Sequence, residues 1–222
     1  MNKRTINYLD ILLKKYKELV ICKEGIIDAF SILKQCFSNG NKLLIAGNGG
    51  SCADAEHIVG ELMKNFRINR MCSNDFAKKL NSISKKNGPI LASKLQIGFP
   101  AIALHSHPGL NTAFLNDVND GGLFVFAQQT FAYGKKDDVF LGISTSGNAL
   151  NVLYATIVAK ALGMKTICLT GNDGGQISKV ADVSIIVPLK ETFEIQELHL
   201  PIYHCLCLML EEEFFGIDES NN

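Results

Sequence analysis

The sequence has few of the features that mark secreted, membrane-spanning or nucleic-acid-binding proteins. Its 22 Lys and Arg residues are balanced by 22 Asp and Glu residues, so the formal net charge is zero. A chain without excess charge offers no electrostatic basis for binding duplex DNA or a membrane surface. Residues 1–20 are charged throughout and lack the apolar core of a signal peptide, and the apolar stretch 198–210 is too short to span a bilayer. We therefore expect a cytoplasmic protein without a nucleic-acid or membrane partner.

The sequence also lacks an internal linker and a disulfide pattern. No Pro-, Ser- or Gly-rich stretch divides its 222 residues, of which 47% are hydrophobic, enough for one sizeable core. The seven cysteines are odd in number and lie mostly in apolar segments, which is typical of reduced core thiols in a cytosolic protein. We predict one domain over residues 1–222.

Hydrophobic periodicity predicts an alternation of strands and helices. Apolar residues spaced three and four apart predict two amphipathic helices, over 6–20 and 23–37, before the first strand. The predicted strands cover 42–46, 100–104, 138–144, 165–170 and 183–187. The predicted later helices run from the end of the first glycine loop to about 66, and over 110–115, 122–133, 148–162, 175–180 and 194–215. Continuous apolar strands between helices indicate an α/β fold: a doubly wound parallel sheet flanked by helices, with an N-terminal helical pair over 1–38.

Two regions interrupt this pattern. The segment 70–98 is polar, carries six Lys or Arg against one Asp, and has only a weak helix signal near 75–84. We interpret it as an insertion, either a lid or a solvated surface loop. The acidic cluster Glu211–Glu213 is interpreted as a solvated helix end.

The strongest functional motif is the run Ser144, Thr145, Ser146, which follows a predicted buried strand and precedes a helix. Its hydroxyls, and the free backbone N–H groups at the positive end of the helix, bind a phosphate without Lys or Arg. A plain helix cap needs only one such residue. We therefore predict a phosphate site here.

A second loop, Gly47–Ser51, stands in the same position after the first strand. Its glycines allow a close approach of the backbone to a ligand, although a tight turn alone also explains them. The loop has neither the Lys of a P-loop nor the spacing of a dinucleotide fingerprint. Because the carboxyl ends of parallel strands meet at one edge, the two loops are predicted to form two walls of one crevice.

Two helices carry candidate catalytic side chains. His57 and Glu61 stand four residues apart on one helix face, where they form either a surface pair or part of a zinc or proton-transfer site. The last helix places Gln196 and His204 in an apolar stretch, where His204 alone also fits a core histidine. Eight residues separate these two by about 12 Å along a straight helix, too far for two ligands of one metal unless they are stretched or one serves a neighbouring subunit. Pro201, between them, is expected to disturb the helix.

Taken together, the motifs resemble those of the phosphoheptose isomerases of the SIS (sugar isomerase) superfamily, in the same order along the chain. The resemblance runs from about residue 38 to 215, apart from the segment 70–98, which typical members lack. The set is specific, although no single motif is. It consists of Gly47–Ser51, His57 with Glu61, Asn116 with Asp117, Gly142–Asn148, Leu169–Gly175, and Ile195–His199 with His204.

The resemblance implies a SIS domain of the flavodoxin-like, three-layer type, assembled as a homotetramer with sites at subunit interfaces. It implies the conversion of sedoheptulose 7-phosphate to D-glycero-D-manno-heptose 7-phosphate, with Glu61 and His204 as the acid–base pair. It implies one zinc ion per subunit, with the ligands His57, Glu61, Gln196 and His204. The implied contacts of the sugar-phosphate substrate are Asn48, Gly49, Gly50, Ser51, Asn116, Asp117, Ser144, Thr145, Ser146 and Gln196.

Some residues depart from the family pattern and keep alternatives open. Ala149 stands where a phosphate-binding Ser is common, Asn65 where an Arg is common, and Phe193 with Glu194 where Asp-Arg is usual. These changes, with the insertion, leave an isomerase of another sugar phosphate open. A non-catalytic SIS protein would have lost the zinc and acid–base residues, all of which are present here. A SIS-type transcription regulator would need a helix-turn-helix domain, for which the first 40 or so residues leave little room.

Overall fold

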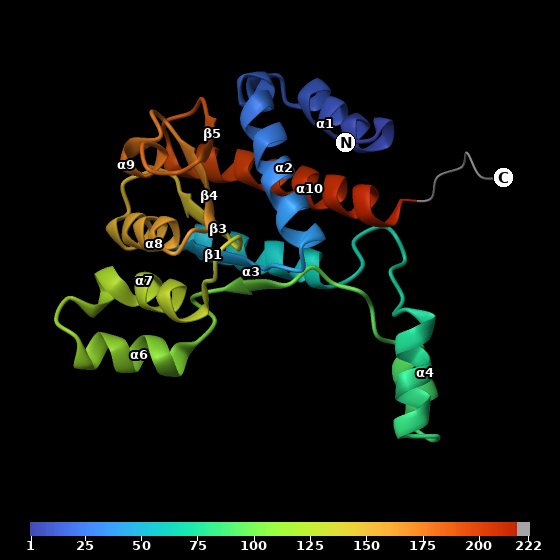
Figure 1. Cartoon of the computed structure of the whole chain (residues 1–222). Coiled ribbons are helices and arrows are strands. Elements are labelled where there is room, and N and C mark those ends of the chain that lie inside the picture. The colour runs from blue at the N-terminus through green and yellow to red at the C-terminus, as the bar shows by residue number, and fades with distance from the viewer. Residues whose placement is uncertain (217–222) are drawn as a thin grey trace.

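The computed structural model describes residues 1–216 and contains one five-stranded parallel sheet (Figure 1). The strands are β1 (Leu43–Gly47), β2 (Ala101–Ala103), β3 (Val139–Ser144), β4 (Lys165–Gly171) and β5 (Val183–Val187). Their order in the sheet is β2-β1-β3-β4-β5, and every neighbouring pair is parallel. This is the flavodoxin-like order. The predicted α/β class and all five predicted strands are confirmed.

Helices cover both faces of the sheet, which gives three layers. The first face carries α2 (Lys23–Ser38), α3 (Gly50–Met63) and α10 (Thr192–Phe215), with α1 (Lys3–Lys15) packed outside on α10. The second carries α7 (Gly121–Tyr133), α8 (Leu150–Ala161) and α9 (Gly175–Ser178), with α6 (Pro108–Asp117) outside on α7. The predicted helix over 6–20 is instead two elements, because Tyr16 leaves the helical conformation after α1 and a 3₁₀ helix, Lys17–Cys22, follows.

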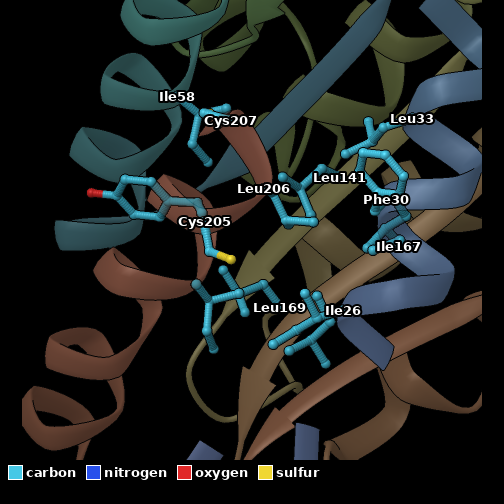
Figure 2. Close-up of a cluster of buried hydrophobic side chains, with 14 of the residues drawn as sticks. Ile26, Phe30, Leu33, Ile58, Leu141, Ile167, Leu169, Cys205, Leu206 and Cys207 are labelled. Carbon is cyan, nitrogen blue, oxygen red and sulfur yellow. The ribbon is translucent and has the colours of Figure 1, made fainter. Parts of the chain in front are cut away.

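Successive side chains along each strand point to opposite faces of the sheet and so contribute to two separate hydrophobic cores. On β1, Leu43 and Ile45 face the first layer, whereas Leu44 faces the second. Figure 2 shows the first core, where α2, α3, the strands and α10 meet around residues such as Phe30 and Leu206. Burial on both faces explains why the strands read as continuous apolar runs rather than alternating ones.

The helix α10 is continuous through Pro201. The expected disturbance does not occur, so the prediction at this position is wrong. A proline inside a helix costs roughly 3 kcal/mol through the lost hydrogen bond and ring clash. Half of the helix is buried against α1, α2, α3 and the sheet, with Ile202 and Met209 fully so. Burial of such side chains contributes about 1.5–3 kcal/mol each, which outweighs that cost.

The helices α3 and α10 run parallel and in step with one another. Near the start of both, a Cβ atom on Gly50 would meet the Gln196 amide nitrogen at 2.6 Å. Further along, His57 contacts His204 across a sequence separation of 147 residues. Just past the end of α3, the N–H of Phe66 donates to Glu211 across a separation of 145 residues. Steps of seven and nine residues along α3 and the chain just after it correspond to steps of eight and seven along α10, so three successive pairs of residues lie face to face.

The segment 70–98 folds into two helices, α4 (Asn74–Ile83) and α5 (Gly88–Ala92). The helix predicted near 75–84 is confirmed. The two ends of the segment 70–98 are joined by an antiparallel bridge between Met71 and Gln96. Figure 1 shows α4 standing away from the sheet, beyond the far end of α3 and α10.

A buried ion pair fixes the base of this segment. Arg70 Nε lies 3.1 Å from Glu211 Oε1, and the two side chains are 1% and 2% exposed. Glu211 also accepts the backbone N–H groups of residues 66–68, and Arg70 donates to the carbonyl groups of Glu61 and Leu62 at the end of α3. The interpretation of Glu211–Glu213 as a solvated helix end is therefore wrong, because its first carboxylate is buried and fully engaged.

We predict that Glu211→Gln lowers the free energy of unfolding by about 3–5 kcal/mol, because it leaves the Arg70 guanidinium buried without a counter-charge. Urea denaturation followed by circular dichroism measures the change. The matched control is Asp75→Asn, which removes an exposed ion pair with Lys78 and should leave the denaturation midpoint unchanged. Equal midpoints for the two variants would contradict the role assigned to the buried pair.

Candidate active site

A cleft of about 390 Å³ opens at the carboxyl edge of the sheet, between the loops that follow β1 and β3. This is the point where the strand order reverses direction, the usual place for a ligand in an open α/β sheet. Of the predicted substrate residues, eight line it. The full lining is Asn48, Gly49, Gly50, Ser51, Ile143, Ser144, Thr145, Ser146, Ala149, Thr192 and Gln196. The prediction that the two loops form walls of one crevice is confirmed.

The cleft offers hydrogen-bond donors without charged side chains. The helices α3 and α8 both begin at it, and the residues that precede them, Gly49 and Ala149, cap neither helix with a side chain. The positive dipole ends of both helices therefore face the cleft, where they favour an anion. The Ser and Thr hydroxyls of residues 144–146 add to them, and no Lys or Arg stands among the described lining residues.

The two loops are tied together across the cleft. Asn48 on the first loop and Asn151 on α8 donate to each other's side-chain oxygen, both at 2.9 Å. The second loop also turns through Gly147, whose φ is +64° and whose Cα packs against the Gly174 carbonyl. Only glycine fits there, because any Cβ would overlap that backbone.

A second cluster lies about two helical turns further along α3 and α10. His57 Nε2 is 3.3 Å from His204 Nε2 and 3.5 Å from Glu61 Oε1. The other Glu61 oxygen accepts from Lys64 Nζ at 2.6 Å. Burial, and secondarily the nearby His57, lower the pKa of His204, so its imidazole is neutral near pH 7.

The far side of His57 meets a tyrosine. The Tyr203 hydroxyl lies 3.0 Å from His57 Nδ1 and 3.1 Å from Asp54 Oδ1. Burial raises the pKa of both Tyr203 and Asp54. Within residues 1–216, no group of three or more His, Cys, Asp or Glu side chains is arranged to hold a metal ion.

Sequence comparison relates the chain to known isomerases. Two profiles of the SIS domain match residues 7–89 and 112–206. A phosphoheptose isomerase from Geotalea daltonii is 40% identical over 83% of this chain and 82% of its own length. One from Helicobacter pylori is 37% identical over 89% and 88%.

Solved structures agree with this relationship. The phosphoheptose isomerase of Neisseria gonorrhoeae matches with a TM-score of 0.68 and 32% identity, over 93% of each chain. That of Francisella tularensis matches with a TM-score of 0.69 and 30% identity, over 92% of this chain and 98% of its own. The chain belongs to the phosphoheptose isomerase family. The family predicted from the motifs is thereby confirmed.

Three residues carried over from the family pattern lie apart from the cluster around His57, and two of these lie outside the cleft as well. Gln196 lines the cleft beside Gly50, about 12 Å along the helix from His204. Asn116 and Asp117 lie on the exposed end of α6, where the Asn116 amide donates to Asp117 Oδ1 at 2.9 Å. Neither is among the described residues that line the cleft, and no residue of the segment 70–98 is either.

The histidine of the core is His199, not His204. His199 is fully buried, its Nε2 contacts the Thr170 carbonyl at 3.3 Å, and burial lowers its pKa to about 4. Outside the cluster, His105 Nε2 pairs with Glu56 Oε1 at 3.0 Å.

In the described part of the chain, no helix is both long and apolar enough to cross a membrane.

Sequence reasoning missed four residues of these sites. Asn151 and Thr192 give no signal of their own, because a polar residue near a helix start is common. Asp54 stands three residues before His57, so helical spacing already places the two on one face. Tyr203 precedes His204 in an apolar stretch, and a buried tyrosine hydroxyl needs a partner.

We predict that Gly50→Ala weakens binding of inorganic phosphate about tenfold, the equivalent of one lost hydrogen bond, with little loss of stability. The new Cβ meets only the flexible end of Gln196, at 2.6 Å, and pushes it into the cleft. Gly147→Ala should instead lower the free energy of unfolding by about 2 kcal/mol or more. Calorimetric titration and urea denaturation separate the two effects.

The matched control for both variants is Gly60→Ala on the same helix as Gly50. A Cβ at Gly60 meets nothing within 4 Å, so this variant should bind phosphate normally and gain slightly in stability. Unchanged phosphate affinity in Gly50→Ala would count against the cleft as the anion site.

Proposed function

We propose that this protein is an aldose–ketose isomerase that converts sedoheptulose 7-phosphate into D-glycero-D-manno-heptose 7-phosphate. The observation that carries the proposal is that one pair of helices serves both ends of such a substrate. The first turns of α3 and α10 line a cleft suited to a phosphate, and their middle turns bring His57, Glu61 and His204 together.

The distance between these two places suits a seven-carbon sugar phosphate. Gln196 and His204 are separated by about 12 Å along α10. A seven-carbon chain with a terminal phosphate reaches about 10 Å from its first carbon to phosphorus, at roughly 1.2 Å per bond of an extended chain. A phosphate bound in the cleft therefore leaves C1 and C2 near the middle of the helix pair.

The reaction moves a proton between C1 and C2 through a cis-enediol. It needs one group that takes the proton from carbon and returns it to the neighbouring carbon, and a second group that carries the hydroxyl proton. Glu61 and His204 flank His57 from two different helices, at 3.5 and 3.3 Å. We assign Glu61 to the carbon-bound proton and His204 to the hydroxyl proton. Phosphate binding away from the reacting carbons orients them.

The zinc ion that the family resemblance implies draws support from two separations among three of the four predicted ligands. Zinc bonds of about 2.0–2.1 Å to nitrogen or oxygen place two ligand atoms of a tetrahedral site about 3.4 Å apart. The separations of 3.3 Å between His57 and His204, and of 3.5 Å between His57 and Glu61, agree with this value. Gln196 stands too far along α10 to complete the set within one chain.

We therefore propose that His57, Glu61 and His204 hold the ion, and we keep Gln196 as a substrate contact. A bound zinc ion would polarise the carbonyl and hydroxyl oxygens of the sugar. A carboxylate that is bound to a cation is a weaker base, so Glu61 would hold the ion and take the proton at different moments of turnover.

The assembly belongs to the same proposal. We propose a cytoplasmic homotetramer with sites at subunit interfaces, as the family resemblance implies. The exposed position of Asn116 and Asp117, outside the cleft of their own chain, favours a contribution of these residues to a neighbouring subunit's site.

One observation favours a second candidate, an isomerase of another phosphorylated sugar. Ala149 lines the cleft where the family commonly has a Ser, which removes one hydroxyl from the phosphate end. Assay of other ketose and aldose phosphates beside sedoheptulose 7-phosphate decides between the two. A purely binding role is disfavoured, because His57, Glu61 and His204 are all present and lie together.

We predict that Glu61→Gln lowers kcat by about 100-fold or more, because the amide cannot take a proton from carbon. Sugar-phosphate affinity should remain, since the cleft is untouched. Product formation from sedoheptulose 7-phosphate, followed by NMR, measures the rate. The matched control is Glu56→Gln on the same helix, whose carboxylate contacts His105 and Ser106, and its rate should stay near wild type. A fully active Glu61→Gln enzyme would refute the assignment.

We predict that removal of metal by a chelator abolishes turnover and that zinc restores it. Elemental analysis of the protein as purified should find about one zinc per chain. His57→Ala should lose the metal yet keep phosphate affinity, because its side chain lies away from the cleft. Turnover at the wild-type rate in protein shown to be free of metal would rule out the zinc site.

A further inference from the structure

The imidazole of His57 is held from both of its nitrogen atoms. Nε2 faces His204 and Glu61, the two other residues of the proposed site. Nδ1 faces the Tyr203 hydroxyl at 3.0 Å. An imidazole that binds a metal or accepts a proton at Nε2 must carry its own proton on Nδ1, so the partner of Nδ1 decides whether Nε2 is available.

The direction of the hydrogen bonds follows from the groups present. Tyr203 has one hydroxyl proton and two neighbours, Asp54 Oδ1 at 3.1 Å and His57 Nδ1 at 3.0 Å. A carboxylate accepts but does not donate, so the hydroxyl proton goes to Asp54. The Tyr203 oxygen is then left to accept, and the only proton that His57 can offer it is the one on Nδ1. The opposite tautomer would leave the Asp54 oxygen without a donor.

We infer that Tyr203 and Asp54 are positioning residues that hold His57 in the tautomer with its proton on Nδ1 and its lone pair on Nε2. The inference rests on the proposed function, because it concerns the availability of His57 for the ion. Tyr203 is not among the described residues that line the cleft, so its role in this inference is to act through His57.

The surroundings make this arrangement rigid. Tyr203 is 2% exposed, and its ring meets that of His57 edge to face at a centroid distance of 5.4 Å. Asp54 lies one helical turn before His57 on α3, so both follow the same helix. Its second oxygen, Oδ2, is buried and has no hydrogen-bond partner in the described structure. Because one carboxylate oxygen is already unpaired, loss of the hydrogen bond from Tyr203 would leave Asp54 without a donor at either oxygen, which costs free energy in a partly buried site.

Tyr203→Phe is the direct test, because it removes the hydroxyl and keeps the buried ring. In metal-free protein at pH 8, where imidazoles are neutral, ¹⁵N NMR should find wild-type His57 with its proton on Nδ1. The variant should show a mixture of both tautomers. Zinc affinity, measured against a chromophoric chelator, should fall by about 10–100-fold.

Three further variants sharpen the test. Tyr154→Phe changes a tyrosine that stacks on Phe124 away from the site, and should alter neither readout. Asp54→Asn keeps an oxygen that accepts from Tyr203, so its zinc affinity should fall less than that of Tyr203→Phe. In the Tyr203→Phe background, Asp54→Asn should add no further loss, because the chain of hydrogen bonds is already broken.

The outcomes separate this inference from the proposed function. Wild-type protein that binds no zinc, together with a tautomer change in Tyr203→Phe, would refute the zinc site and support the role of Tyr203. A folded Tyr203→Phe that keeps the Nδ1 proton on His57 and binds zinc within twofold of wild type would overturn the inference. If Tyr203→Phe does not fold, Asp54→Ala, which removes the acceptor of the Tyr203 proton, takes its place, and an unchanged tautomer and zinc affinity in that variant would overturn the inference.

Discussion

The parallel, in-step packing of α3 against α10 is the constraint on which both functional regions depend. Gly50 meets Gln196 at one end of the pair, His57 meets His204 in the middle, and Glu211 binds the chain just past α3 at the other end. Each residue turns a helix by about 100°, so a slip of one residue would rotate these side chains away from one another. Close contact at a glycine and a buried ion pair hold the register from opposite ends.

This packing divides the work between the backbone and the side chains. The phosphate end of the site is made by loop geometry and helix starts, which the sheet fixes at the point where its strand order reverses. The reactive end is made by side chains on the middle turns of two helices. The first depends on local conformation at positions such as Gly147, and the second on how two elements distant in sequence are aligned. A change at one end therefore need not disturb the other.

The sequence predicts most of the first region and only part of the second. The loops around Gly49 and Ser146 follow buried strands, so topology alone brings them together. Periodicity cannot say how α10 is rotated, and so it could not tell that His199 is the core histidine and that the half-buried His204 is the one that meets His57. Pro201 and Glu211 misled for a related reason: local propensity predicts a break and a solvated end, but burial of the whole helix overrides both. The role of Tyr203 could not be predicted from the sequence, because it depends on Asp54 and His57, which lie opposite it on another helix.

The neck of the segment 70–98 has a consequence for how this chain tolerates change. The two ends of the segment meet at the bridge between Met71 and Gln96, and Ile97 N–H donates to the Arg70 carbonyl at 2.6 Å. The excursion thus leaves and re-enters the domain at a single point, as a side branch leaves a stem. The length and composition of the segment can change without altering the path of the chain on either side, because the entropic cost of closing a loop grows only slowly with its length. It is the natural place to graft a label or a tether.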